Sequence, residues 1–370
     1  MKKKVMIIGG GFYGMFLSNF LSSLGFEITL CEKEDKLMSR SSLINQARVH
    51  KGFHYCRSAL TALRSSISYI KFINNYKDAI ETNFNSYYAI SKLNSKTTAN
   101  QFEDFLSKLS INYNISSDSY KDLFNNNLVE QIYQVEEKVF NSHVLLEIMS
   151  EKLANANVSI NLNTFISNVH NEGDFLLAKS NNHHVENIKY DFIFNCTYSG
   201  LNFFNENNKL NLKHRVSEMA LVSLPAELQG KSITLMDGPF FSLMPYPTAG
   251  KGIYSLSHVN YTHHDTLNEG ADFYKLYRNP EMIRNIYKSN YKYMLSDASR
   301  FLPCLGKLEY VDSIWDIKTT LLSSDVNDSR PIVFNEDKNR KNFFSILGGK
   351  IDNVFDLEDF IKNKFKLAND

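Results

Sequence analysis

One stretch near the N-terminus decides the fold: Val5-Met6-Ile7-Ile8-Gly9-Gly10-Gly11-Phe12-Tyr13-Gly14. Its short, continuous apolar run is typical of a strand buried on both faces of a parallel sheet. The glycines that follow match the pattern G-x-G-x-x-G. Apolar residues then recur at helical spacing up to Gly25, and a second short strand over 28–31 ends on Glu32. This order of strand, glycine turn, helix, strand and acid predicts a dinucleotide-binding βαβ unit.

Each part of the motif has a physical task. Gly9 permits the tight turn, Gly11 lets the backbone approach a pyrophosphate, and Gly14 lets the helix pack closely on the strand. The helix N-terminus offers unpaired N–H groups and a positive dipole to phosphates. Glu32 is placed to accept hydrogen bonds from ribose hydroxyls, and its charge would repel the 2′-phosphate of NADP. A glycine-rich turn without a ligand is the alternative interpretation.

Composition bounds the class of protein. The chain has 370 residues and a net charge of +1, so we expect two domains, or one with a large insertion, and no dedicated nucleic-acid binding. The four cysteines form no C-x-x-C pair, which favours a reduced interior. The first apolar run stops after four residues, whereas an export signal needs roughly 7–15. No stretch approaches the roughly 20 apolar residues of a membrane span, so we expect a cytoplasmic protein.

A long polar segment follows Glu32. Residues 36–58 are dense in small and titratable side chains and lack helical periodicity, which indicates a functional loop beside the cofactor. Here the sequence resembles the D-amino-acid-oxidase-like superfamily of FAD-dependent oxidoreductases. Ser41, Ser42, Asn45 and Gln46 match the stretch that in those proteins follows the pyrophosphate and flavin. The run His50-Lys51-Gly52-Phe53-His54-Tyr55 resembles the 2-hydroxyglutarate-dehydrogenase-like branch.

Three later segments extend the resemblance. The run 190–200 is similar to the family's strand that returns to the cofactor through a turn of small residues, although Cys196 and Tyr198 are larger. Gly348-Gly349-Lys350-Ile351 resembles the G-G-K-I element of the glycerol-3-phosphate-dehydrogenase-like branch, where backbone approaches the flavin. Asp328-Ser329-Arg330-Pro331 resembles the segment whose arginine faces the substrate. Segments near 76–140 and 216–320 match far less.

The resemblance implies FAD as cofactor and a set of residues that contact it. That set is Gly9, Gly11, Phe12, Tyr13, Gly14, Glu32, Lys33, Ser41, Ser42, Asn45, Gln46, Arg48, Thr197, Gly200, Gly348, Gly349, Lys350 and Ile351.

The expected fold class is α/β, or α+β over the whole chain. A Rossmann-like FAD-binding domain with a parallel sheet carries an inserted substrate domain built on a mainly antiparallel sheet. We expect the FAD-binding domain at 1–75, 141–215 and 325–370, and the substrate domain at 76–140 and 216–324. In the latter, Asn279-Pro280 is expected to start a helix with Arg284, Lys288 and Lys292 on one face. A solvated face is the preferred interpretation of that basic stripe.

A flavin carries out redox chemistry itself, so the protein must hold the substrate and manage its proton. Arg330 is the expected anion anchor, because a guanidinium binds carboxylate or phosphate through two hydrogen bonds. An ordinary surface ion pair is the alternative. His50 and His258 are the candidate proton acceptors, although a histidine bound only to backbone fits equally well. His50 or Cys56 could also tether the flavin covalently. No histidine or cysteine spacing fits a closed zinc site, so we expect no metal.

These features predict an FAD-dependent oxidoreductase, either an oxidase or a dehydrogenase. It would remove a hydride from a carbon bearing an amine or hydroxyl in a small, anionic substrate such as an amino acid, a hydroxy acid or a sugar derivative. A non-redox flavoenzyme similar to UDP-galactopyranose mutase is one alternative, although the Gly348-Gly349-Lys350-Ile351 element favours the oxidoreductases. A non-enzymatic flavin-binding protein is the other. Reduction of bound flavin by a substrate would separate the first interpretation from both.

Overall fold

The computed structural model describes residues 2–116, 121–204, 209–323 and 332–365. A six-stranded sheet carries the N-terminal motif, and only its edge pair β19–β20 is antiparallel. In spatial order its strands are β19 (Val333–Glu336), β20 (Phe343–Leu347), β12 (Phe192–Asn195), β1 (Lys4–Ile8), β2 (Glu27–Cys31) and β9 (Ser159–Asn161). Strands β1 and β12 are buried along almost their whole length, as the continuous apolar run predicts.

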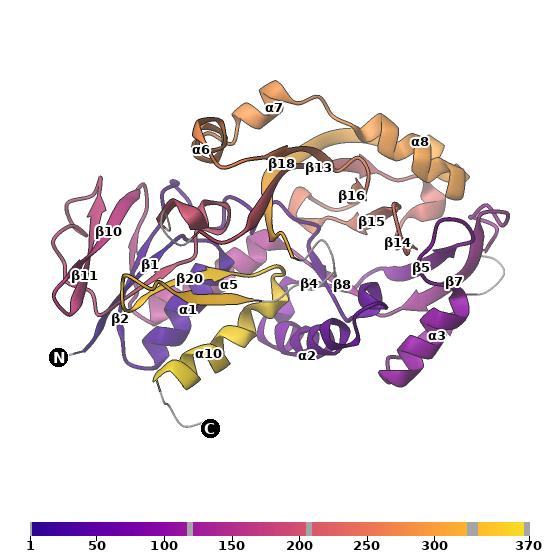
Figure 1. The fold of residues 1–370 in the computed structure, drawn as a ribbon. Coiled ribbons are helices and arrows are strands. Elements are labelled where there is room, and N and C mark those ends of the chain that lie inside the picture. The colour runs from indigo at the N-terminus through magenta and orange to yellow at the C-terminus, as the bar shows by residue number, and fades with distance from the viewer. Residues whose placement is uncertain (1, 117–120, 205–208, 324–331, 366–370) are drawn as a thin grey trace.

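A larger sheet of nine strands stands beside the first (Figure 1). Its pairs are antiparallel except for β5 with β14. The strands are β5 (Asn85–Ser91), β6 (Tyr113–Ile115), β7 (Val129–Val135), β13 (Leu212–Ser223), β14 (Lys231–Met236), β15 (Phe241–Pro245), β16 (Ile253–His258), β17 (His263–Leu267) and β18 (Glu309–Leu321). A parallel sheet joined to a mainly antiparallel one confirms the predicted fold class.

Two small sheets complete the strands. The hairpin of β10 (Ile166–Glu172) and β11 (Phe175–Ser180) packs near one end of the six-stranded sheet. The other small sheet is formed by β3 (Arg48–Val49), β8 (Lys138–Phe140) and β4 (Ile80–Glu81). In this second sheet the expected loop after Glu32 pairs with a segment almost a hundred residues further along the chain.

The helices cover the outer faces of the two large sheets. Against the six-stranded sheet and its core lie α1 (Phe12–Ser23), α2 (Ala59–Asn75), α5 (Ser142–Asn155) and α10 (Asp356–Phe365). The larger sheet carries α3 (Ala99–Lys108), α6 (Ala271–Arg278), α7 (Met282–Ile286) and α8 (Tyr291–Phe301), and Figure 1 shows the last three along its top. None of the helices in the described residues is long and apolar enough to cross a membrane.

The prediction of one helix that runs from Asn279-Pro280 through Lys292 is wrong. Helix α7 ends at Ile286, and α8 begins only at Tyr291. Arg284 lies on α7 and donates to the Ser313 carbonyl oxygen at 2.8 Å, whereas Lys288 lies between the helices. The continuous basic stripe therefore does not exist, because helical spacing has meaning only within one unbroken helix.

Candidate functional site

The site begins where three parallel strands end side by side. Ile8 of β1 is paired with Cys31 of β2 and with Asn195 of β12, so all three carboxyl ends lie at the same edge of the sheet. In open α/β sheets, ligands bind in the crevice outside this edge. The glycine turn and Glu32 come directly after two of these strands, and the segment from Cys196 comes after the third.

The three motif glycines do different work in the turn. Gly9 has φ +108°, and a Cβ there would lie 2.7 Å from the Cys196 carbonyl oxygen. A Cβ on Gly14 would lie 1.9 Å from the Gly9 carbonyl oxygen, so Gly14 is what allows α1 to pack on β1. A Cβ on Gly11 would meet only Ser42 Oγ, at 3.2 Å, and would otherwise project into open space. The backbone around Gly11 therefore forms an open cradle, and a methyl group at this position would project into it.

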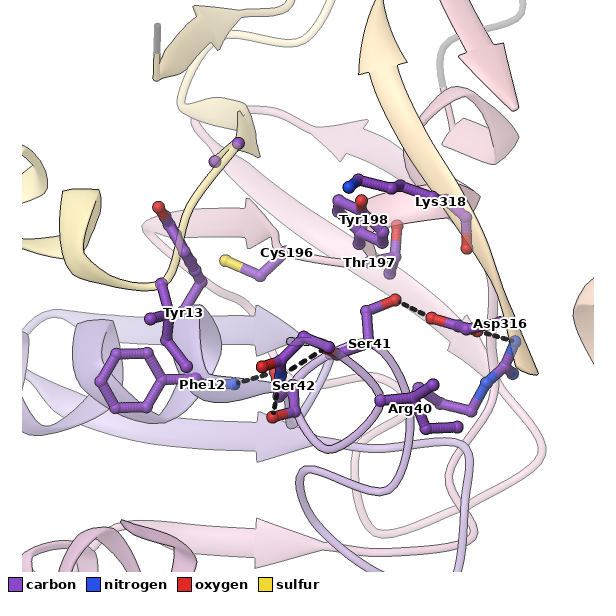
Figure 2. Close-up of a pocket in the computed structure, with 18 of the residues that line it drawn as sticks. Phe12, Tyr13, Arg40, Ser41, Ser42, Cys196, Thr197, Tyr198, Asp316 and Lys318 are labelled. Carbon is purple, nitrogen blue, oxygen red and sulfur yellow. Dashed lines mark hydrogen bonds and ion pairs between the residues drawn. The ribbon is translucent and has the colours of Figure 1, made fainter. Parts of the chain in front are cut away.

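The start of α1 suits an anion. Its N-cap residue, Gly11, has no side chain to cap the helix, and its first turn holds no acidic residue. The Phe12 amide donates to Ser42 Oγ at 2.9 Å, which fixes the following loop against the helix end (Figure 2). Free N–H groups and the positive end of the helix dipole fit the pyrophosphate of a dinucleotide.

Glu32 lies beside the turn at the end of β2. Its Oε2 accepts from the Gly10 amide at 2.6 Å, and its Oε1 accepts from the Glu34 amide at 2.9 Å. Burial raises the pKa of Glu32, while these two amides and Lys33 oppose the rise. The carboxylate is thus held in one orientation at the cavity wall, as a ribose-binding acid requires.

The loop after Glu32 connects the two large sheets. Ser41 and Arg40 both bind Asp316 of β18, the arginine through an ion pair of 3.5 Å (Figure 2). Gln46 donates to Ser257 Oγ of β16. Asn45 shapes the loop itself, because its Oδ1 accepts from the Ala47 amide at 2.6 Å. The polar residues that the sequence assigned to cofactor contact also hold the larger sheet in place.

Two further turns complete the wall. A Cβ on Gly348 would lie 2.0 Å from the ring of Tyr13, whose hydroxyl donates to the Lys350 carbonyl oxygen at 2.6 Å. On the other side, a Cβ on Gly200 would lie 2.4 Å from the hydroxyl of Tyr277 in α6. Glycine at both positions therefore lets aromatic side chains pack directly on the backbone of the cavity wall.

One cavity of about 450 Å³ joins these pieces, a size typical of small-molecule and cofactor sites. Gly14, beneath the helix, is the only predicted cofactor residue that does not line it, and it shapes the turn instead. The predicted residues along the wall are Gly9, Gly11, Phe12, Tyr13, Glu32, Lys33, Ser41, Ser42, Asn45, Gln46, Arg48, His50, Thr197, Gly200, Gly348, Gly349, Lys350 and Ile351.

The three catalytic candidates have different outcomes. His50 lines the cavity, with its Nδ1 3.4 Å from Glu137 Oε1. On β16 it is Ser257 that lines the cavity, and strand alternation turns His258 to the other face, where its Nε2 lies 2.9 Å from Asp297 Oδ2. The expectation that His258 belongs to the site is therefore wrong: the buried His258 pairs with the partly exposed Asp297 outside the cavity. Arg330 lies outside the described residues.

Several cavity residues were not predicted from the sequence. Arg57 Nε lies 2.8 Å from Asp237 Oδ2, and both residues line the cavity. Asp316 and Lys318 enter it from β18, and in Figure 2 Lys318 lies beside Tyr198 while Asp316 lies beside Ser41 and Arg40. Arg57 stands in the polar loop and could have been chosen for its charge. The others come from the larger sheet, where no motif marks them.

The sequence matches a known protein family. The family model for FAD-dependent oxidoreductases of the DAO family matches residues 4–349. The FAD-dependent monooxygenase FPY4 of Fusarium mangiferae is 24% identical over 350 residues, which are 94% of this chain and 87% of that protein.

Solved structures share the fold. L-alpha-glycerophosphate oxidase from Mycoplasma pneumoniae, with FAD bound, superposes with a TM-score of 0.73 at 16% identity, covering 98% of this chain and 94% of that one. Glycine oxidase from Geobacillus kaustophilus gives a TM-score of 0.72 at 11% identity, covering 95% and 91%.

The chain thus belongs to the DAO family of FAD-dependent oxidoreductases. FAD is its cofactor, which confirms the prediction that the resemblance to the D-amino-acid-oxidase-like superfamily implied. The glycine cradle, the helix N-terminus and the oriented Glu32 carboxylate are groups that fit this dinucleotide. Membership in an oxidoreductase family favours the redox interpretation over the mutase and over a non-enzymatic flavin-binding protein.

Proposed function

We propose that this FAD-dependent oxidoreductase removes a hydride from a carbon that bears an amine or hydroxyl group in a small anionic substrate. The observation that carries the proposal is one continuous cavity, whose wall contains the glycine turn together with His50, Arg57 and Lys318. A dinucleotide site thereby opens onto a proton acceptor and onto cations from the adjoining loop and sheet.

In this proposal, different elements of the chain bind different parts of the cofactor. The turn from Gly9 and the start of α1 bind the pyrophosphate, and Glu32 binds the ribose. Gln46, Arg48 and the turn at 348–351 would hold the flavin, which when bound would supply the hydride acceptor. The remaining work, which is to orient the substrate and take its proton, falls to side chains of the chain.

Charge supports an anionic substrate. The cavity wall contains six Lys or Arg side chains against three Asp or Glu, which suits both a pyrophosphate and a second anion. Of the cavity arginines, Arg57 has the most exposed side chain, at 40% against 2% for Arg48. Asp237 accepts from Arg57 Nε and so leaves the guanidinium oriented. We therefore assign Arg57 as the anion anchor within the described residues.

His50 is the proposed proton acceptor. As the hydride leaves the substrate carbon, the proton of the amine or hydroxyl group must also leave, and a positioned imidazole near neutral pH can accept it. His50 enters the cavity from the strand end at Val49, next to the segment expected along the flavin.

The test is anaerobic mixing of the holoenzyme with small amino acids, hydroxy acids and their uncharged amides or esters. Loss of the oxidised-flavin absorbance with an anionic member, and not with its uncharged counterpart, is the expected result. Arg57→Gln should then raise the KM for that substrate about 10-fold or more, since a charged hydrogen-bonding pair is worth roughly 1.5–3 kcal/mol. Arg64→Gln, on the exposed face of α2, is the matched control and should change nothing.

Two outcomes would contradict the proposal. In one, no amine or alcohol reduces the flavin; in the other, an uncharged analogue does so as fast as its anion. Because the relative in Fusarium mangiferae is named a monooxygenase, the product formed in air should also be weighed by mass spectrometry. A product that gains an oxygen atom, rather than losing two hydrogens, would replace the proposed reaction by oxygen insertion.

A further inference from the structure

Two consecutive glutamates between β7 and β8 have opposite surroundings. Glu136 is exposed and binds Lys51, and its Oε1 accepts from the Tyr69 hydroxyl at 3.3 Å. Glu137, the next residue, is only 3% exposed. Burial of a carboxylate is costly unless charged or polar groups compensate it, so the partners of Glu137 indicate its role.

Glu137 lies between two side chains of the cavity wall. Its Oε2 is 3.5 Å from Arg48 Nε, and its Oε1 is 3.4 Å from His50 Nδ1; both contacts are at ion-pair distance and neither has hydrogen-bond geometry. Arg48 is held from the other side by Thr234 Oγ1, at 3.0 Å from one of its terminal nitrogens. Burial raises the pKa of Glu137, and the Arg48 guanidinium opposes that rise. A buried arginine keeps its proton and needs a counter-charge, which Glu137 provides.

We infer that Glu137 is a positioning residue, which turns Nδ1 of His50 toward its carboxylate and thereby makes Nε2 the nitrogen that accepts the substrate proton. A carboxylate that orients an imidazole from behind fixes both its tautomer and its direction, as in other acid–base sites. The inference rests on the proton-acceptor role proposed for His50.

The other groups around His50 determine whether loss of the Glu137 charge raises or lowers the pH at which His50 takes up a proton. His54 and Tyr55 have ring centres 6.0 and 5.6 Å from the His50 ring. Desolvation, and then the Arg48 charge, lower the pKa of His54, so that ring is neutral near pH 7. Arg48 and Glu137 carry opposite charges beside His50, and a positive neighbour disfavours an imidazolium whereas a carboxylate favours it. Removing the Glu137 charge should leave the influence of Arg48 unopposed.

The experiment compares Glu137→Gln with Glu136→Gln in the FAD-loaded enzyme. In Glu137→Gln, the midpoint of the His50 titration, followed by ¹⁵N-histidine NMR without substrate, should move about one pH unit or more to lower pH. The acid limb of the kcat/KM profile should move with it. The glutamine amide can also donate to Nδ1, which enforces the wrong tautomer, so kcat should fall about 10- to 100-fold. Glu136→Gln should leave both midpoints and kcat unchanged.

An unchanged His50 titration in Glu137→Gln would overturn the inference, whatever happens to activity. A shifted titration combined with full flavin reduction in His50→Asn would instead refute the proton-acceptor role, while the contact between Glu137 and His50 would stand. If Glu137→Gln does not retain FAD, Glu137→Asp keeps the charge and serves in its place. The aspartate variant should hold the wild-type titration midpoint, and a midpoint lowered by a unit would contradict the assigned charge effect.

Discussion

Replacing Gly14 by alanine is expected to push α1 away from β1. The added Cβ would lie 1.9 Å from the Gly9 carbonyl oxygen, and this neighbour is backbone, so no change of rotamer relieves the clash. To restore an ordinary contact of about 3.4 Å, the helix start must move by roughly 1.5 Å. Overpacking costs about 1–3 kcal/mol, and a backbone clash belongs at the upper end. The better helix propensity of alanine returns at most about 1 kcal/mol, which leaves a loss of about 2 kcal/mol.

Gly11→Ala should behave differently although it changes the same motif. Its Cβ would meet only the Ser42 hydroxyl, at 3.2 Å, so the apo-protein should lose less than about 1 kcal/mol. The new methyl group would, however, occupy the cradle that we assign to the pyrophosphate. FAD binding should weaken about 10-fold or more, equivalent to about 1.4 kcal/mol. Gly306→Ala, with no atom within 4 Å of its Cβ among the described residues, is the matched control for both.

Urea unfolding of the three apo-proteins measures the free energy of unfolding, and equilibrium dialysis measures the FAD dissociation constant. Gly14→Ala should lose stability and, because the helix end moves, FAD affinity as well. Gly11→Ala should lose FAD affinity but almost no stability. Gly306→Ala should keep both its stability and its FAD affinity. An apo Gly14→Ala protein within about 0.5 kcal/mol of wild type would refute the packing argument. An apo Gly11→Ala protein that loses about 2 kcal/mol would refute the open cradle.

Two buried groups give expectations that depend on pH. Burial raises the pKa of Asp352 from 3.8 to about 6, so ionisation of the folded chain above that pH costs of the order of 3 kcal/mol. Asp352→Asn should stabilise the apo-protein by up to this amount near pH 8 and by well under 1 kcal/mol near pH 4; equal gains at both would contradict the burial argument. Burial also raises the pKa of Cys196 to about 12. Iodoacetamide near pH 8 should alkylate it roughly 1000-fold more slowly in the native than in the unfolded chain, as followed by mass spectrometry, and comparable rates would show an accessible thiolate.

The cofactor half of the site was readable from the sequence because its chemistry depends on backbone shape. Glycine at positions 9, 11 and 14 leaves a pattern that no ordinary turn requires, and the strands beside it are apolar on both faces. The motif residues are therefore neighbours both in the sequence and in the folded structure. Backbone shape also matters at Gly348, where a glycine permits close packing against Tyr13.

The cavity residues outside the glycine turn and its loop could not be predicted from the sequence, because they come together only through long-range strand pairing. His258 was a candidate proton acceptor because of its chemistry, but the alternation of a strand gives two faces and does not say which one meets the cavity. Asp237 and Glu137 stand in no motif, and their partners Arg57 and His50 come from a loop far away in the sequence. The pairing of β14 in the larger sheet places Asp237, and the pairing of β3 with β8 in the small sheet places Glu137 beside His50.

The loop at 36–58 gives the two halves a shared support. Ser42 accepts from the Phe12 amide at the helix end, while Ser41 binds Asp316 and Arg48 binds Thr234, both on the larger sheet. A displacement of this loop would therefore change the phosphate cradle and the substrate wall together. That coupling follows from the covalent chain, since only five residues separate Ser42 from Arg48. It explains why this segment is rich in polar side chains, because neighbouring residues bind both the start of α1 and the larger sheet.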